Sequence, residues 1–141
     1  AHTFHQRVEP TTDFDKITSL DYRQADWISG WTREGKKSIE YGFITNYASQ
    51  EPHEDFAELF GNYVILSADE WEAKLVSADV IPAGRTRSGR SIIEEKIRII
   101  KDYMINTWGL DMDKLRAQLH ARYPNFARQD FTTMTSSTTQ Q

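Results

Sequence analysis

Cysteine is absent from this chain of 141 residues, which excludes disulfide bonds and thiolate metal sites. Any metal ion must therefore bind to His, Asp or Glu side chains. An excess of basic residues is also missing, because 17 Lys and Arg stand against 21 Asp and Glu and give a net charge of −4. Nucleic-acid binding relies on a basic face that neutralises phosphates, so no nucleic-acid partner is expected.

Long apolar runs, strong hairpin signals and internal repeats are missing as well. No segment approaches the ~20 apolar residues that cross a bilayer, so the sequence predicts no transmembrane segment. Hydrophobic residues still make up 38% of the chain, and a chain of this length can form one domain with a real core. We therefore expect a single domain of mainly α class.

Apolar residues at helical spacing predict the helices of the first half. The segment Thr11–Asp13 offers N-cap oxygens for a short helix over residues 14–20. Residues 21–35 predict an aromatic-rich loop or short helix, and residues 42–50 predict an ordered loop. A longer helix begins at Pro52, and its spacing predicts one apolar stripe, formed by Phe56, Leu59, Phe60, Tyr63 and Val64.

Two capped helices are predicted next. Ser67 and Glu70 have the spacing of a capping box, and the short helix behind them buries Trp71 and Leu75. Ser91 is predicted to cap the longest helix, with Glu94 at the capping-box position and Gly109 at its C-terminal end. The apolar side of this longest helix is predicted to consist of Ile93, Ile97, Ile100, Met104 and Trp108.

A final helix is predicted to begin at Asp111 or Asp113 and to end before Pro124. The chain after it is rich in Thr, Ser and Gln, which is typical of a disordered segment. We therefore divide the chain into a helical subdomain, residues 1–123, and an extended or disordered tail, residues 124–141.

Two carboxylates on the helix after Pro52 are candidates for a site. Glu54 and Glu58 are four residues apart, so they share one helix face, where their like charges are mildly destabilising. A cation near Glu54 removes that penalty, and a metal-ligating histidine is a suitable partner for Glu58 beside the apolar stripe. The alternative, a solvated acidic face at a helix start, stays open on spacing alone.

Two segments carry a family resemblance. Ala1-His2-Thr3-Phe4-His5-Gln6 resembles the end of His-Glu-x-Ala-His-x-x-His-Gln, the zinc helix of a family of zinc-binding metallopeptidase lipoproteins from Bacteroidetes. A second family pattern appears as Tyr47 followed by Glu54, Phe56, Ala57, Glu58 and Phe60, and it is also similar to the zinc domain of anthrax lethal factor. With the long helix and the segment after it, the resemblance to the lipoprotein family covers most of the chain.

The resemblance implies a set of roles. His2 matches the second histidine of HExxH and would bind zinc, and Glu54 matches the glutamate that supplies the third protein ligand. Glu58 matches a carboxylate that orients a ligand histidine. Tyr47 matches a tyrosine that stabilises the oxyanion during peptide hydrolysis. For His5, helix packing is the alternative to a chemical role.

The first histidine and the catalytic glutamate of HExxH are expected immediately before Ala1. We therefore expect the chain to begin inside the zinc helix, as the helical C-terminal subdomain of a gluzincin-type metallopeptidase. By itself it is expected to bind zinc weakly and to be inactive, whereas the parent protein would act on a peptide or protein substrate.

Family members are typically encoded beside outer-membrane nutrient-import systems of the SusC/SusD type. The resemblance therefore implies a lipoprotein of the outer membrane in the cell envelope, with a SusC/SusD-type import complex as a partner. Two alternatives to the peptidase remain: a non-catalytic accessory or binding module of such a nutrient-uptake system, and a degenerate metallopeptidase that keeps only the fold.

Other features have a structural and a functional interpretation. The aromatic residues between 22 and 41 would form either a carbohydrate-stacking platform or core and loop packing, and packing is favoured. Arg85, Arg87 and Arg90 would form either an anion site or a solvated basic turn. His53 is a spare ligand beside Glu54 in principle, although adjacent helix residues point in different directions.

Overall fold

The structure is a computed structural model that describes residues 12–123. Helices and helical turns form all the regular secondary structure in that range, as predicted for the mainly α class. The short elements come first: α2 (Thr12–Ile17), the 3-10 turn η1 (Gln24–Trp27), α3 (Gly30–Arg33), and the 3-10 turns η2 (Ser38–Tyr41) and η3 (Tyr47–Ser49). Longer helices follow: α4 (Pro52–Ile65), α5 (Ala68–Ala78), α6 (Gly89–Trp108) and α7 (Met112–Arg122). None of these described helices is long and apolar enough to cross a membrane.

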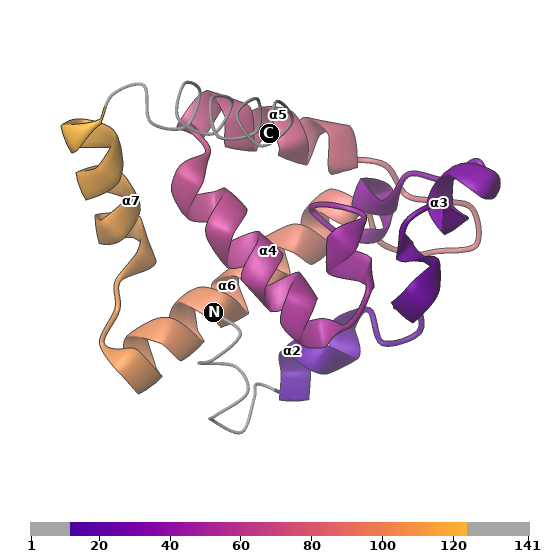
Figure 1. The fold of residues 1–141 in the computed structure, drawn as a ribbon, viewed down its shortest axis with the longest axis horizontal. Coiled ribbons are helices and arrows are strands. Elements are labelled where there is room, and N and C mark those ends of the chain that lie inside the picture. The colour runs from indigo at the N-terminus through magenta and orange to yellow at the C-terminus, as the bar shows by residue number, and fades with distance from the viewer. Residues whose placement is uncertain (1–11, 124–141) are drawn as a thin grey trace, which may run out of the picture.

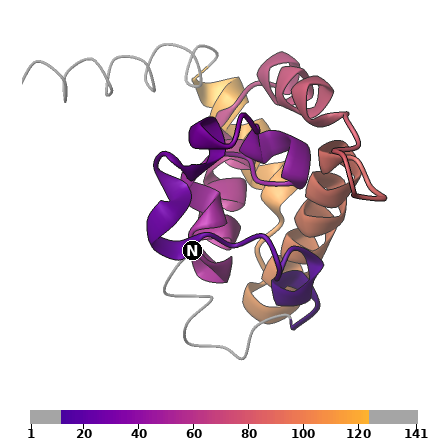
Figure 2. The same cartoon turned by 90° about the vertical axis from the view of Figure 1, so that its right-hand side faces the viewer.

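Helix α4 runs through the middle of the molecule. Figure 1 shows it crossing α6, with α5 at the top of the view, α7 at the left and α2 at the bottom. Helix α4 packs against η3, α6 and α7, and α6 packs in turn against α2, η2 and α5. Figure 2 shows α2 lying against one side of α6. The start of α4 is therefore fixed from several directions.

An aromatic contact at Phe56 joins three helices near the start of α4. The Phe56 ring is fully buried, and its centroid lies 5.6 Å from that of Phe14 in α2, edge to face. On another side, the Tyr103 ring of α6 makes an edge-to-face contact at the same centroid distance of 5.6 Å. Such pairs contribute about 0.5–1.5 kcal/mol each beyond the burial of their area. This contact therefore holds the first turn of α4 in place.

The apolar stripe predicted for α4 is confirmed, with four of its members buried and Phe60 partly buried against the core. The predicted capping box of α5 is confirmed too. The Glu70 backbone N–H donates to Ser67 Oγ over 3.1 Å, and the Ser67 N–H donates to Glu70 Oε1 over 3.0 Å. Gly109 ends α6 in the left-handed conformation, with a φ of 63°.

The predicted start of α6 is wrong by three residues. Ser88, not Ser91, is the N-cap residue, and its Oγ accepts the backbone N–H of Ser91 over 3.1 Å. The helix extends back to Gly89 because a residue without a side chain lets the backbone of η2 approach. A Cβ atom there would lie 2.1 Å from the carbonyl oxygen of Ile39. At the other end of α6, Trp108 is 41% exposed and does not belong to the buried side.

One smaller prediction is wrong, and another, which left two N-cap residues open, is decided by the structure. Helix α2 ends at Ile17, and Leu20, which was predicted to be its last residue, is 95% exposed. Helix α7 begins after Asp111, whose side chain accepts the Lys114 backbone N–H over 3.1 Å, so Asp111 rather than Asp113 is the N-cap. The division into a subdomain and a tail at residue 123 stays a prediction, since residues 124–141 lie outside the described range.

Candidate metal centre at the start of helix α4

Three carboxylates lie at the first turn of α4. Glu51 is the N-cap residue in an extended conformation, and Pro52 occupies the first helical position, where a missing N–H costs nothing. Glu54 and Asp55 follow in the first turn, where the helix dipole stabilises negative charge. Glu54 is 7% exposed and Asp55 is fully buried. The solvated acidic face that the spacing of Glu54 and Glu58 left open is therefore wrong for Glu54.

Tyr47 meets Glu54 across the packed contact between η3 and α4. The pKa of Tyr47 is raised above its ordinary value of 10.0, mainly by a hydrogen bond to the Glu54 carboxylate and secondly by burial. The phenol is therefore protonated at neutral pH, and its single O–H group is donated to Glu54. The Trp27 ring lies edge to face on the Tyr47 ring at 4.8 Å between centroids, and this contact limits the movement of the phenol.

Glu58 lies one turn further along α4 and is partly buried. Its Oε1 accepts a hydrogen bond of 2.7 Å from the Thr45 hydroxyl, and Thr45 Oγ1 accepts in turn from the Ala48 backbone N–H over 3.1 Å. The chain therefore brings Tyr47, Glu54 and Glu58 to the contact between η3 and α4. His2 and His5, the predicted ligand and its neighbour, lie outside the described residues.

A group of three donors gathers where α4 begins. Glu51, His53 and Glu54 each offer one ligand atom, and these atoms all lie within 4.8 Å of one another. His53 Nε2 lies 2.8 Å from Glu51 Oε1. The objection that adjacent helix residues point apart does not exclude His53, because its ligand atom lies within 4.8 Å of that of Glu54. One imidazole and two carboxylates are among the ligands that zinc takes in proteins, so the donor set fits this metal.

A buried ion pair lies directly behind Glu54. Asp55 and Lys96 are both fully buried, and Lys96 Nζ donates to Asp55 Oδ2 over 2.7 Å and to the Gly42 carbonyl oxygen over 2.9 Å. The Tyr22 hydroxyl donates to the same Asp55 oxygen over 2.8 Å. Burial raises the pKa of Asp55 and lowers the pKa of Lys96, and the attraction between the two charges opposes both changes.

Sequence reasoning missed this ion pair. Neither Asp55 nor Lys96 is among the residues predicted above to be buried. The signal was present in the spacing, because Lys96 lies three residues after Ile93 and four before Ile100 and therefore shares their buried face. A lysine inside an apolar stripe requires a buried acceptor, since an unpaired buried charge is costly.

Of the aromatic residues between 22 and 41, Trp31 and Tyr41 lie in the core and Tyr22 packs against it. Trp31 is 1% exposed and donates from Nε1 to Ser49 Oγ over 2.9 Å, and Tyr41 is 7% exposed. Tyr22 packs edge to face on Phe43 at 5.3 Å between centroids. The packing interpretation is therefore confirmed for these rings, and a stacking platform made from them is excluded.

The three arginines between 85 and 90 are bound in ion pairs. Arg85 contacts Asp21, Arg87 Nη1 lies 2.6 Å from Glu95 Oε1, and Arg90 Nη1 lies 2.9 Å from Glu72 Oε2. Each guanidinium therefore has a carboxylate of its own, which argues against an anion site built from these residues.

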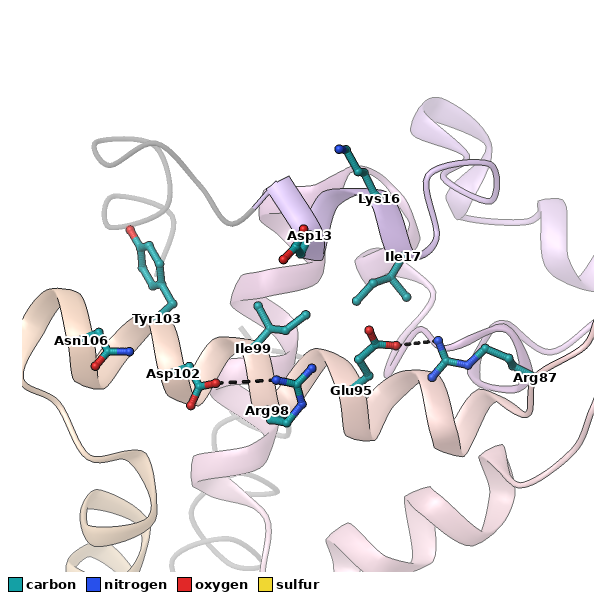
Figure 3. Close-up of a pocket in the computed structure, with 10 residues that line it drawn as sticks. All are labelled: Asp13, Lys16, Ile17, Arg87, Glu95, Arg98, Ile99, Asp102, Tyr103 and Asn106. Carbon is teal, nitrogen blue, oxygen red and sulfur yellow. Dashed lines mark hydrogen bonds and ion pairs between the residues drawn. The ribbon is translucent and has the colours of Figure 1, made fainter.

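A cavity of about 650 Å³ lies between α2 and α6, away from the start of α4. Its lining combines both signs of charge, and Figure 3 shows Glu95 directed toward Arg87 and Arg98 directed toward Asp102. The Arg98 Nη1 to Asp102 Oδ2 distance is 3.7 Å. Because its charges are largely compensated and the predicted site residues are not among its lining, this cavity is not the candidate site.

The helical fold resembles that of a metallopeptidase of known structure. Residues 1–113 match the profile of a family described as "Putative zinc-binding metallo-peptidase", and the chain belongs to this family. A solved structure described as "a putative zinc-binding metallo-peptidase from Bacteroides caccae ATCC 43185" is 29% identical, with a TM-score of 0.70. The match covers 92% of this chain and 46% of that one, so the chain spans about half the length of its relative. No curated protein matches.

Proposed function

We propose that this chain forms part of a zinc metallopeptidase and supplies one side of its metal centre and substrate cleft. The observation that carries the proposal is the meeting of Tyr47 with Glu54 at the buried start of α4, in a chain that belongs to a zinc-binding metallopeptidase family. A buried carboxylate beside a protonated phenol matches the chemistry of peptide hydrolysis, which requires a metal ligand and a donor to the developing oxyanion.

Glu54 and His2 are the proposed zinc ligands within this chain, and His53 and Glu51 are the nearest alternatives. When bound, zinc supplies Lewis-acid polarisation of the substrate carbonyl and lowers the pKa of a water molecule toward 7. Tyr47 donates its hydroxyl proton in a hydrogen bond to the carbonyl oxygen as negative charge develops there. Its contact with Trp27 holds the phenol ready for this role.

Glu58 is proposed to orient a ligand histidine through a hydrogen bond to the second ring nitrogen. The hydrogen bond from Thr45 fixes one of its oxygens and leaves the other for that role. The general base is proposed to be the glutamate of an HExxH motif that precedes Ala1, so the chain alone would be inactive.

The cellular setting is proposed from the family resemblance alone. We place the protein in the cell envelope as an outer-membrane lipoprotein, with a peptide or protein substrate and an import complex of the SusC/SusD type as partners. The alternative of an accessory module that binds glycans through its aromatic residues is weakened by the burial of Trp31 and Tyr41.

Metal analysis tests the proposal. Zinc content would be measured for this chain and for a version extended upstream through the complete HExxH. The extended protein should retain about one zinc per chain, and this chain alone much less. Absence of zinc from both would remove the metallopeptidase proposal.

Two variants of the extended protein locate the ligands. Glu54→Gln keeps the shape of the side chain and should lose zinc, whereas His53→Ala should retain it. Circular dichroism of both variants checks that the helices persist. If Glu54→Gln keeps full zinc occupancy and His53→Ala loses it, the ligand is His53 and the assignment made here is wrong.

A further inference from the structure

A second cavity, of about 390 Å³, is lined in part by the two residues that directly precede Tyr47, and it is called here the basic cavity. It is formed by the end of α3, η2, the segment before η3 and one side of α5. Its lining consists of Trp31, Thr32, Lys36, Lys37, Ser38, Ile39, Ile44, Thr45, Asn46, Lys74 and Ser77.

The charge of this cavity is of one sign. Lys36, Lys37 and Lys74 line it, and no Asp or Glu does. Lys36 Nζ lies 3.3 Å from Glu34 Oε1, outside the lining, whereas Lys37 and Lys74 form no ion pair within residues 12–123. The whole chain is acidic, with a net charge of −4, so an uncompensated cationic cavity is unusual on this surface.

One short segment of the chain links the basic cavity to the candidate site. Thr45 and Asn46 line the cavity and directly precede Tyr47, the proposed oxyanion donor. The Thr45 hydroxyl donates to Glu58 over 2.7 Å, so one short segment has the cavity on one side and the carboxylates of α4 on the other. A substrate residue a few positions from the scissile bond is therefore within reach, because an extended peptide advances about 3.3 Å per residue.

The lining suits a peptide group that combines an apolar part with a carboxylate, either an acidic side chain or the C-terminus. Trp31, Ile39 and Ile44 supply apolar surface, and the Ser38 hydroxyl holds the Asn46 side chain by a hydrogen bond to Oδ1. That bond engages the oxygen of the Asn46 amide, which leaves its N–H groups as further donors. Ammonium groups and amide donors together recognise a carboxylate.

We propose that the basic cavity is a substrate subsite that binds a peptide carboxylate, and that the enzyme therefore prefers substrates with an anionic group near the scissile bond. The interpretation of this cavity as a substrate subsite rests on the proposed function. The carboxylate comes either from an acidic side chain or from the free C-terminus of the peptide. These two sources define an endopeptidase with acidic preference and a carboxypeptidase, respectively.

Peptide binding to this chain, without metal, tests the cavity directly. The isotope-labelled chain would be titrated with acetyl-Ala-Glu-Glu-Ala-amide, with acetyl-Ala-Ala-Ala-Ala bearing a free carboxylate, and with acetyl-Ala-Gln-Gln-Ala-amide, while amide NMR shifts are followed. We expect saturable shifts at Thr45, Asn46 and Ser77 with one or both anionic peptides and none with the neutral one. Binding of only one anionic peptide identifies the source of the carboxylate.

A double variant and a matched control make the test specific. Lys37→Gln with Lys74→Gln should weaken the binding of the anionic peptide roughly fivefold or more, because the double variant removes two cationic contacts with the carboxylate. Lys16→Gln with Lys114→Gln removes the same net charge from exposed positions outside the cavity and should leave the affinity unchanged.

Three outcomes would overturn the subsite: no binding by either anionic peptide, equal binding of the neutral peptide, or equal weakening in the control variant. Zinc is not involved in any of these measurements. A failure here therefore leaves the metallopeptidase proposal standing, and a failure of the zinc analysis leaves the anion-binding cavity standing.

Discussion

Replacing Lys96 by Met removes one partner of the buried ion pair behind Glu54. Methionine is close to lysine in length, so the change leaves little empty volume and acts mainly on charge. Asp55 then keeps only the hydrogen bond from the Tyr22 hydroxyl, and the Gly42 carbonyl oxygen loses its donor. Asp55 and Lys96 themselves have no exposed surface.

The expected loss of stability is large. Breaking a buried ion pair by removing one partner costs about 3–5 kcal/mol, because an uncompensated charge remains inside. For a chain of this size, 1 kcal/mol corresponds to about 4 °C in Tm, so we expect a fall of about 12–20 °C. For a domain stabilised by about 5–15 kcal/mol, this loss ranges from about a fifth of the stability to all of it.

Urea unfolding followed by tryptophan fluorescence measures this loss, since the chain contains four Trp. Arg98→Met is the matched control, because it breaks a surface ion pair with Asp102 on the same helix, with both side chains 64% exposed. It should cost less than about 1 kcal/mol.

A second variant identifies the cause. Lys96→Met combined with Asp55→Asn removes both charges and keeps an acceptor for Tyr22, so it should be more stable than Lys96→Met alone and lose less than about 2 kcal/mol. If Lys96→Met costs under about 1 kcal/mol, or if the double variant is no more stable than the single one, uncompensated charge is not the reason for the loss.

Two further predictions concern the backbone and acid stability. Gly42→Ala should lower the free energy of unfolding in urea by about 2–5 kcal/mol, because φ is 96° and a Cβ atom would lie 2.3 Å from the Ile92 side chain. Gly35→Ala is the control: its φ is 68° but the space is open, so it should cost only about 1 kcal/mol. The hydrogen bond from the Tyr63 hydroxyl lowers the pKa of Asp113 below its ordinary value of 3.8. The ionised Asp113 therefore stabilises the fold fully above pH 3.8, and this stabilisation is lost as the pH falls through the folded-state pKa. Tyr63→Phe should therefore cost a small constant amount between pH 6 and 8, and this difference should shrink in unfolding curves recorded below pH 3.8; a difference that grows on acidification would contradict the assignment.

Local patterns predicted much of the fold. The apolar stripe of α4 and the Ser67 capping box depend only on residues within two turns of helix, so their spacing is sufficient to find them. The start of α6 was misplaced although its cap is local, because Ser88 and Ser91 both have a side chain suited to an N-cap. The spacing also could not show the close approach of η2, which requires a residue without a side chain at position 89.

The candidate site divides in the same way. The spacing of Glu54 and Glu58 placed both on one face of a helix, and the family resemblance added Tyr47 and His2. The burial of Glu54 and the hydrogen bond that it accepts from Tyr47 required the packing of η3 on α4. His2 lies outside the described residues, so its role as a ligand stays a prediction.

The sequence by itself determined the mainly α class, the main helices and the helix that carries the candidate ligands, because helical periodicity and capping act over a few neighbouring residues. Only the tertiary structure decided which charges are paired. Asp55 and Lys96 are 41 residues apart in the chain, and Lys37 and Lys74 reach the same cavity from different elements. Desolvation and Coulomb attraction depend on distances in space, and those distances are set by how α4, α5 and α6 pack.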